Sequence, residues 1–196
     1  LYAATLTNDA NEKEAIYKKA AECYDKDYRA YNNLAVMAFN KGDENAAKSY
    51  VKQAFAKNQK APEGYANLAL IALRNGNIAE AESNLSKAIN ANGFGEVLGN
   101  LNIAKGNYAT AVKNFEGSKS NSAALAQILN KDYAAAVATL KDQKNADALS
   151  DYLMAIVQNR QGNTAAAQDY LNSAIKKNSA LSQYADNDLE FANLKK

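Results

Sequence analysis

Apolar and small residues recur three and four positions apart along most of the chain, and short polar turns interrupt them. This spacing places the apolar side chains on one face of a helix, so it predicts a series of amphipathic helices. Glycine closes the end of a helix, and a following Asp or Asn caps the start of the next helix. Four turns combine these residues and predict corners between antiparallel helices: Lys41-Gly42-Asp43, Asn75-Gly76-Asn77, Lys105-Gly106-Asn107 and Gln161-Gly162-Asn163.

Residue size follows a fixed pattern around these turn glycines. A small residue lies seven positions before each glycine, alanine five positions after it, a large apolar residue nine after it and a small residue twelve after it. Two helices approach closely only where small side chains face each other, so we expect these positions to form the contacts between paired helices. The four sets are Ala35, Ala69, Gly99 and Ala155; Ala47, Ala81, Ala111 and Ala167; Val51, Leu85, Phe115 and Leu171; and Ala54, Ala88, Ser118 and Ala174.

Two further turns have another residue in place of the glycine. Asn8 fits such a turn because asparagine adopts the left-handed conformation more readily than most residues. Lys131 in that conformation would cost on the order of 1 kcal/mol, so we expect this turn to be rebuilt around Asn130. Turn positions 8, 42, 76, 106, 131 and 162 are 34, 34, 30, 25 and 31 residues apart, so the repeat shortens after its second period.

The composition agrees with an all-helical chain. One proline in 196 residues favours long uninterrupted helices, and no strand-like alternation persists. Near the end, apolar residues are interspersed with Ser182, Asp186 and Asp188, which predicts a helix that seals the array from water. The apolar residues of this segment are Leu181, Tyr184, Leu189, Phe191 and Leu194.

The two regular periods resemble the tetratricopeptide repeat, a helical hairpin of 34 residues. A third segment, Leu98-Gly99 with Gly106 and Ala111, matches from its midpoint onward. Later repeats depart from the pattern, because Ser120 and Asp151 replace the leading aromatic residue and Gln143 replaces the final small residue. The closest matches are Tyr31-Asn32-Asn33-Leu34-Ala35 with Gly42 and Ala47, and Tyr65-Ala66-Asn67-Leu68-Ala69 with Gly76 and Ala81.

The resemblance implies an all-α fold, an α-α superhelix (solenoid) of about five to six hairpins, the later ones shortened and irregular. We expect a single array over residues 1–196. Its expected parts are a truncated first repeat (1–27), two regular repeats (28–61 and 62–92), shortened or degenerate repeats (93–179) and a C-terminal capping helix (180–196).

The residue types present argue against catalysis and metal binding. The chain has no histidine, which removes the commonest general base and transition-metal ligand. Its one cysteine, Cys23, has no histidine partner and is expected to be a buried or half-buried packing residue. Asp186-Asn187-Asp188 begins like a calcium loop, but Phe191 stands where glycine is required, and helix capping explains these carboxylates better. We therefore expect no enzyme activity, no cofactor and no metal.

The charge and hydropathy of the chain limit the classes of partner that it could bind. The 23 basic and 21 acidic residues are interspersed, whereas nucleic-acid binding requires a concentrated basic face. No apolar stretch approaches the roughly 20 residues that span a bilayer. We expect a protein or peptide partner, with no nucleic acid and no membrane span.

In the family that the chain resembles, the first helix of each hairpin lines the concave face. Asparagine amides on this face can pair with the backbone of an extended peptide, and apolar neighbours can receive its side chains. Alternatively, asparagine before leucine is a consensus feature of the repeat, and the apolar residues pack between repeats. The predicted partner-binding residues are Asn32, Asn33, Val36, Phe39, Asn40, Asn67, Leu70, Arg74, Asn100, Tyr152 and Arg160, with Leu73 and Ile103 on the same stripes.

Two functions are compatible with these features. The first is a non-catalytic scaffold that binds a partner segment on the concave face. The second is a structural spacer or self-association module of a larger envelope protein, because residues 1–6 and 12–17 resemble segments of Gram-negative envelope proteins that carry an OmpA-like, peptidoglycan-binding domain. The chain begins within an expected helix, so the apolar side of Leu1, Tyr2 and Leu6 would be exposed and could form a homo-oligomer. The expected location is periplasmic or outer-membrane-associated, with the cytoplasm as the alternative.

Overall fold

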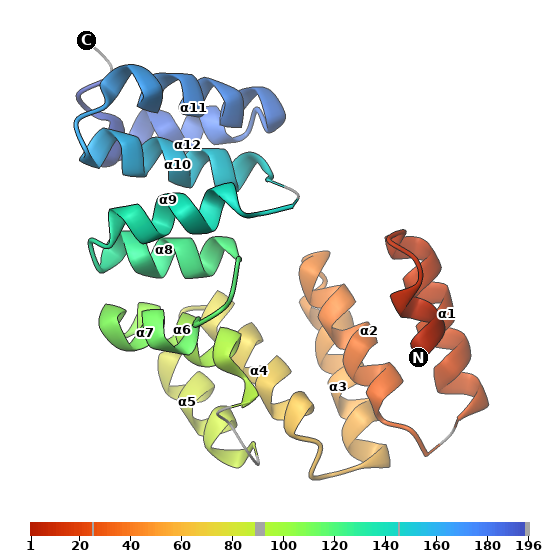
Figure 1. Ribbon diagram of the computed structural model, residues 1–196. Coiled ribbons are helices and arrows are strands. Elements are labelled where there is room, and N and C mark those ends of the chain that lie inside the picture. Colours follow the sequence, from red (N-terminus) through yellow and green to blue (C-terminus); the bar gives the residue numbers. More distant parts are fainter. Residues whose placement is uncertain (25, 89–92, 145, 195–196) are drawn as a thin grey trace. The chain divides into compact units, whose positions relative to one another are not determined.

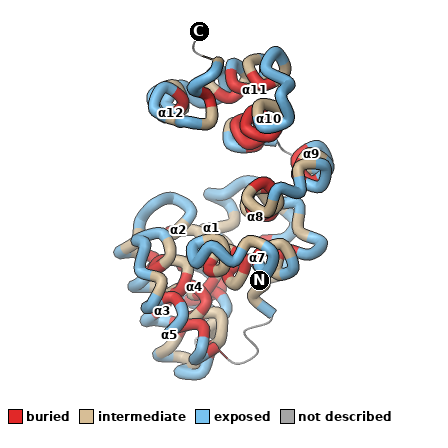
Figure 2. The backbone as a smooth tube through the Cα atoms, turned by 90° about the vertical axis from the view of Figure 1, so that its left-hand side faces the viewer, coloured by how far each residue is buried: buried red, intermediate tan, exposed pale blue. Residues whose placement is uncertain are grey.

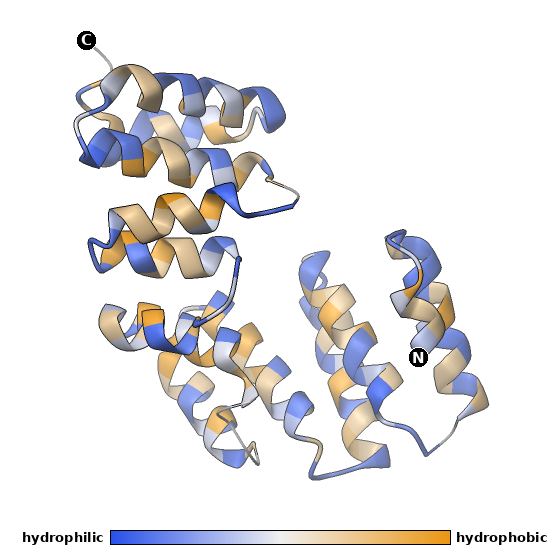
Figure 3. Cartoon of the chain, in the orientation of Figure 1, coloured by the Kyte–Doolittle hydropathy of each residue, from blue (hydrophilic) through white to orange (hydrophobic). Residues whose placement is uncertain are grey.

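The computed structural model describes residues 1–24, 26–88, 93–144 and 146–194, and every regular element in these ranges is a helix (Figure 1). The chain forms two compact units, Leu1–Ala104 and Lys105–Lys196. Each helix carries both hydrophilic and hydrophobic residues (Figure 3), as expected of amphipathic helices.

The first unit is a stack of paired helices. Each helix from α1 to α6 packs against the next, and the first helices of successive hairpins also pack together, α2 against α4 and α4 against α6. These first helices therefore form a continuous layer. The elements are η1 (Tyr2–Thr5), α1 (Ala10–Cys23), α2 (Arg29–Asn40), α3 (Glu44–Lys57), α4 (Pro62–Arg74), α5 (Ile78–Lys87) and α6 (Gly95–Ala104).

The second unit continues the pairing around a more deeply buried helix. In this unit α10 packs against α8, α9, α11 and η3, and it is buried continuously from Ser150 to Val157 (Figure 2). Paired helices stacked in chain order confirm the predicted α-α solenoid class. The elements are α7 (Tyr108–Asn114), α8 (Asn121–Leu129), α9 (Tyr133–Lys141), α10 (Ala148–Arg160), α11 (Thr164–Lys177), α12 (Leu181–Asn187) and η3 (Leu189–Phe191).

The turn glycines have the predicted left-handed conformation. The φ angles of Gly42, Gly76, Gly106 and Gly162 are 82°, 71°, 78° and 82°. The predicted caps form after the first two turns, where the Asp43 and Asn77 side chains accept hydrogen bonds from backbone N–H groups of the following helix. Asn107 and Asn163 occupy the same place before α7 and α11 without a side-chain cap bond.

The predictions for the two substituted turns are wrong. Lys131 itself takes the left-handed conformation (φ 66°), while Asn130 is right-handed. The reason is a shared turn geometry: the Asp132 N–H donates to the Gln127 carbonyl, as the Asp43 N–H donates to the Ala38 carbonyl. Asn8 has no positive φ, since α1 begins instead from a cap made by Asp9.

Lys131→Gly is expected to raise the free energy of unfolding by about 0.5–1 kcal/mol. Glycine removes the strain that a Cβ causes in the left-handed conformation, and the greater freedom of glycine in the unfolded chain offsets part of this gain. Lys131→Ala is the matched control, because it removes the side chain and keeps the Cβ. Urea unfolding followed by circular dichroism measures both variants. Equal stability of the glycine and alanine variants would show that Lys131 is unstrained.

The residues at fixed offsets form the core, as predicted. The alanines five positions after the turn glycines are at most 1% exposed, and the large residues nine positions after them are also buried. Ser118 differs from its equivalents in being half-buried. Small side chains therefore do lie where paired helices meet.

Three local predictions differ from the structure. The capping helix predicted for residues 180–196 is not one helix over the described residues 180–194. Helix α12 ends at Asn187, and the extended Asp188 then caps η3, which places Phe191 in the core at 1% exposure. Residues 1–6 form a single 3-10 turn over Tyr2–Thr5. Cys23 is exposed, because the buried face of α1 is formed by Ala20 and Ala21.

Candidate partner-binding site

A hollow of about 390 Å³ lies on the first helices of the first unit, α2, α4 and α6. We call it the α2–α4–α6 hollow. It brings together Phe39, Leu70, Arg74 and Asn100 of the predicted binding residues, together with Leu73 and Ile103 of the same stripes. Ala104, which the sequence did not single out, completes the lining.

Arg74 is held at this hollow by two interactions with Phe39. Its guanidinium carbon lies 3.4 Å from the centroid of the Phe39 ring, and its Nη1 donates to the Phe39 carbonyl oxygen at 2.6 Å. That carbonyl belongs to the last turn of α2, where the helix dipole is negative and favours a cation. Within the described residues, no hydrogen bond engages Nε or Nη2 of Arg74. The hollow therefore presents a fixed positive charge that retains donors for a ligand.

The side-chain amide of Asn100 makes one hydrogen bond within its own helix. Its amide Nδ2 donates to the Glu96 carbonyl oxygen at 2.8 Å, four residues earlier in α6. The amide oxygen is therefore the group oriented away from this bond, and it can accept from a ligand donor.

The two asparagines at the centre of the sequence prediction lie between helices. Asn32 is 5% exposed and Asn67 is 9% exposed, and the Asn67 amide donates to the Asn32 carbonyl oxygen at 3.4 Å. Both amide atoms of Asn32 are buried with no hydrogen-bond partner among the described residues. Asn67 therefore links α4 to α2, and neither side chain lines the hollow.

The other predicted residues of α2 are more accessible. Val36 is 38% exposed, Asn40 is exposed and Asn33 is half-buried, and none of them lines the α2–α4–α6 hollow. Their role in binding stays a prediction.

Tyr152 and Arg160 belong to the second unit, where both make internal bonds. The buried Tyr152 donates its hydroxyl to Asp188 at 2.7 Å. Arg160 forms an ion pair with Glu190 and donates to the Ile128 carbonyl oxygen at 3.2 Å. These bonds join α10 to the C-terminal segment and to α8.

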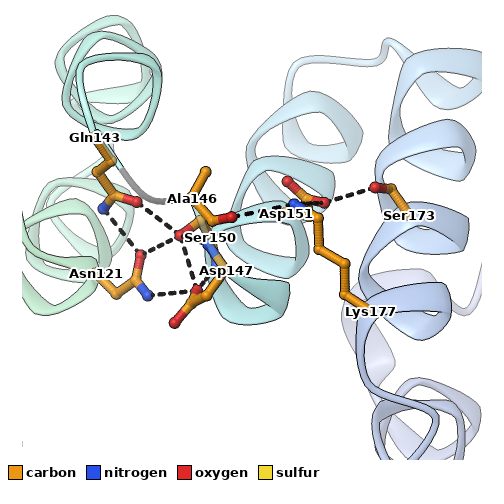
Figure 4. Close-up of polar contacts among 8 residues, drawn as sticks. All are labelled: Asn121, Gln143, Ala146, Asp147, Ser150, Asp151, Ser173 and Lys177. Carbon is orange, nitrogen blue, oxygen red and sulfur yellow. Dashed lines mark hydrogen bonds and ion pairs between the residues drawn. The ribbon is translucent and has the colours of Figure 1, made fainter. Parts of the chain in front are cut away.

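A polar cluster in the second unit surrounds the start of α10 (Figure 4). The Asn121 side-chain amide Nδ2 donates to Asp147 at 3.1 Å, and the Gln143 side-chain amide Nε2 donates to Oδ1 of Asn121 at 3.0 Å. The Ser150 hydroxyl lies within hydrogen-bond distance of Asn121, Gln143 and Asp147. Burial acts to raise the pKa of Asp147, but hydrogen bonds from Ser150 and Asn121 outweigh it and lower that pKa below its usual value.

A second group extends this cluster toward α11 (Figure 4). Asp151, 9% exposed, accepts from the Ser173 hydroxyl at 2.6 Å and pairs with Lys177 at 2.7 Å. Lys177 also donates to the Ala146 carbonyl oxygen at 3.3 Å. These contacts link α11 to the start of α10.

The polar cluster is structural in character. A hollow of about 460 Å³ lies beside it, but the amide donors of Asn121 and Gln143 are used within the cluster. The Ser150 hydroxyl is hydrogen-bonded within the cluster, and Asp147 caps the start of α10. Its effect is to fix the first turn of the most buried helix.

The described residues form neither a metal-binding cluster nor a membrane-spanning helix. No group of three or more Cys, Asp or Glu side chains in these ranges could hold a metal ion. Asp188 instead caps η3 through the Glu190 N–H, in agreement with the capping interpretation of its segment. Within the same ranges, every helix is too short or too polar to cross a bilayer.

Comparison with known proteins identifies the repeat. The tetratricopeptide repeat family matches residues 28–56 and 62–93, which contain α2 to α5. A crystal structure of a tetratricopeptide repeat protein from Parabacteroides merdae aligns with a TM-score of 0.57 and 15% sequence identity, over 86% of this chain and 72% of that chain. A search of curated proteins finds no match. The resemblance to OmpA-like envelope proteins and the periplasmic location stay predictions. Residues 28–56 and 62–93 therefore match the tetratricopeptide repeat family, within a chain that shares the fold of a tetratricopeptide repeat protein.

Proposed function

We propose that this protein is a non-catalytic scaffold that binds a segment of a partner protein in the α2–α4–α6 hollow. Tetratricopeptide repeats generally mediate protein–protein interactions, and most residues that line the hollow belong to the two matched repeats. The observation that carries the proposal is an apolar depression with one guanidinium fixed by Phe39.

The lining suggests the chemistry of the partner segment. Phe39, Leu70 and Ile103 favour an apolar side chain, because its burial removes apolar surface from water. Arg74 favours a neighbouring carboxylate, which can accept charge-assisted hydrogen bonds from the guanidinium. We therefore propose a segment in which an apolar residue lies next to Asp, Glu or a chain terminus.

The same lining supports a non-catalytic role. Its side chains are apolar, an amide and a guanidinium, and none is a general base or a nucleophile near neutral pH. Tetratricopeptide repeat proteins are generally non-catalytic scaffolds.

Ile103→Glu tests this assignment. Peptides selected for binding from a random library are the probe, and calorimetry measures their affinity. A carboxylate in the apolar hollow should weaken binding about tenfold or more, because it must be desolvated and it repels an acidic ligand.

Ser83→Glu is the matched control, because it adds the same charge at an exposed position of α5. It should change the affinity less than about twofold. If Ile103→Glu binds the peptides as tightly as the unchanged chain, the hollow is not the binding site. Asn67 is unsuitable for this test, since its substitution would also break the bond to Asn32.

A further inference from the structure

A second hollow lies in the other unit, between the start of α10 and the C-terminal segment, and has a volume of about 670 Å³. We call it the α10–α12 hollow. Leu149 and Tyr152 line it from α10, Leu181 and Tyr184 from α12, and Asp188 from the residue that follows α12. All of its described lining belongs to residues 105–196, so it is separate from the α2–α4–α6 hollow.

Part of its apolar lining is exposed to solvent. Leu149 is 46% exposed and Tyr184 is 70% exposed. Exposed apolar groups that gather around one depression are a feature of interaction sites, whereas isolated ones are common on any surface. The α10–α12 hollow therefore offers apolar surface that a ligand could cover.

Asp188 is fixed in this hollow by two hydrogen bonds. Its Oδ2 accepts from the Tyr152 hydroxyl at 2.7 Å, and its Oδ1 accepts from the Glu190 N–H at 2.9 Å. A carboxylate has about four acceptor positions, so these bonds orient the group and leave capacity for a ligand donor. The burial of Tyr152 and its bond to Asp188 raise the pKa of that tyrosine, so the phenol remains a neutral donor.

The charge around the hollow is negative. Its described lining contains Asp188 and no lysine or arginine. Residues 178–194 carry Asp186, Asp188 and Glu190 and no basic residue. Two cations of this unit are engaged elsewhere, Arg160 with Glu190 and Lys177 with Asp151. Asp188 therefore lacks a cationic partner among the described residues.

We propose that the α10–α12 hollow binds a basic side chain, arginine or lysine, of a partner protein. The aliphatic stem packs against Leu149, Leu181 and Tyr184, and the cationic head donates to Asp188. The aromatic rings of the lining add attraction for a cation. The site would be a second docking point, which prefers a cation, whereas Arg74 in the α2–α4–α6 hollow prefers a carboxylate.

The test is a titration of the ¹⁵N-labelled chain with acetyl-Leu-Arg-amide, followed by NMR. Acetyl-Leu-citrulline-amide is the matched probe, because citrulline has nearly the shape of arginine without its charge. We expect chemical-shift changes at Leu149, Tyr184 and Asp188 with the arginine probe, and affinity at least about fivefold weaker with citrulline.

Variants of the lining test which side chains bind the probe. Asp188→Asn should lower the affinity for the arginine probe about fivefold or more. Asp186→Asn removes one charge outside the lining and should change that affinity less than about twofold. Tyr184→Ser removes a largely exposed aromatic side chain from the lining and should also weaken binding of the arginine probe. An unchanged circular dichroism spectrum is the check on folding.

Three outcomes would overturn the proposal. Equal affinity for arginine and citrulline would show that the hollow recognises shape or apolar surface only. No shift at the lining residues with the arginine probe or with its lysine counterpart would show that no basic side chain binds. Shifts with maltose and none with these peptides would show that the hollow recognises a carbohydrate.

Discussion

Phe191→Ala is expected to lower the free energy of unfolding by about 3–5 kcal/mol, as removal of a buried aromatic ring leaves a cavity. Phe191 is 1% exposed and packs edge-to-face on Tyr152, with ring centroids 5.2 Å apart. The loss should be large because this ring anchors the short η3 segment to α10. Urea unfolding followed by circular dichroism measures the effect.

Leu189→Ala is the control for this prediction. Leu189 lies in the same 3-10 turn but is 90% exposed, so its truncation should change stability by less than about 0.5 kcal/mol. Similar losses for the two variants would mean that the C-terminal segment is not anchored by Phe191.

Ala155→Leu is expected to destabilise the chain by about 1–3 kcal/mol, because extra methylene groups must force apart closely packed helices. Ala155 is fully buried in α10, and Ala167 is fully buried in the paired helix α11. The substitution increases apolar content, so a loss of stability would show that residue size, not hydrophobicity, is what this position requires.

Ala165→Leu provides the matched control on α11. Ala165 is exposed, and alanine and leucine both favour helices, so the change should be close to neutral. Thermal unfolding of both variants distinguishes the effects. A stabilised Ala155→Leu variant would contradict the interpretation of the recurring small residues.

Local sequence was sufficient to predict the paired helices. Gly42 and Gly76 mark corners because their left-handed φ is built into the turn, and Ala47 and Ala81 recur because paired helices leave no room for larger side chains. Lys131 shows the limit of this reasoning. Hydrogen bonding of the turn imposes the conformation even where the residue disfavours it.

The candidate site was predicted only in part. Helical spacing correctly put Phe39, Leu70 and Arg74 on one side of the first helices. It did not show that Asn32 and Asn67 turn toward the neighbouring helix, because that depends on how α2 and α4 pack. Periodicity assigns a residue to a face, and tertiary packing decides whether that face is open.

Departures from the repeat pattern proved informative in the second unit. Ser120 caps α8, Gln143 joins the cluster around Ser150, and Asp151 bonds Ser173 and Lys177. Each replaces an aromatic or small residue expected from the repeat. The partners of Gln143 and Asp151 come from other helices, so the roles of these two residues could not be predicted from local sequence.

The proposed function requires that a partner segment inserts into the α2–α4–α6 hollow. Its most direct test is NMR of the methyl-labelled chain bound to a library-selected peptide, with measurement of intermolecular nuclear Overhauser effects. We predict contacts from an apolar side chain of the peptide to the methyl groups of Leu70, Leu73 and Ile103. A bound peptide that contacts methyl groups elsewhere and none of these three would contradict insertion into this hollow.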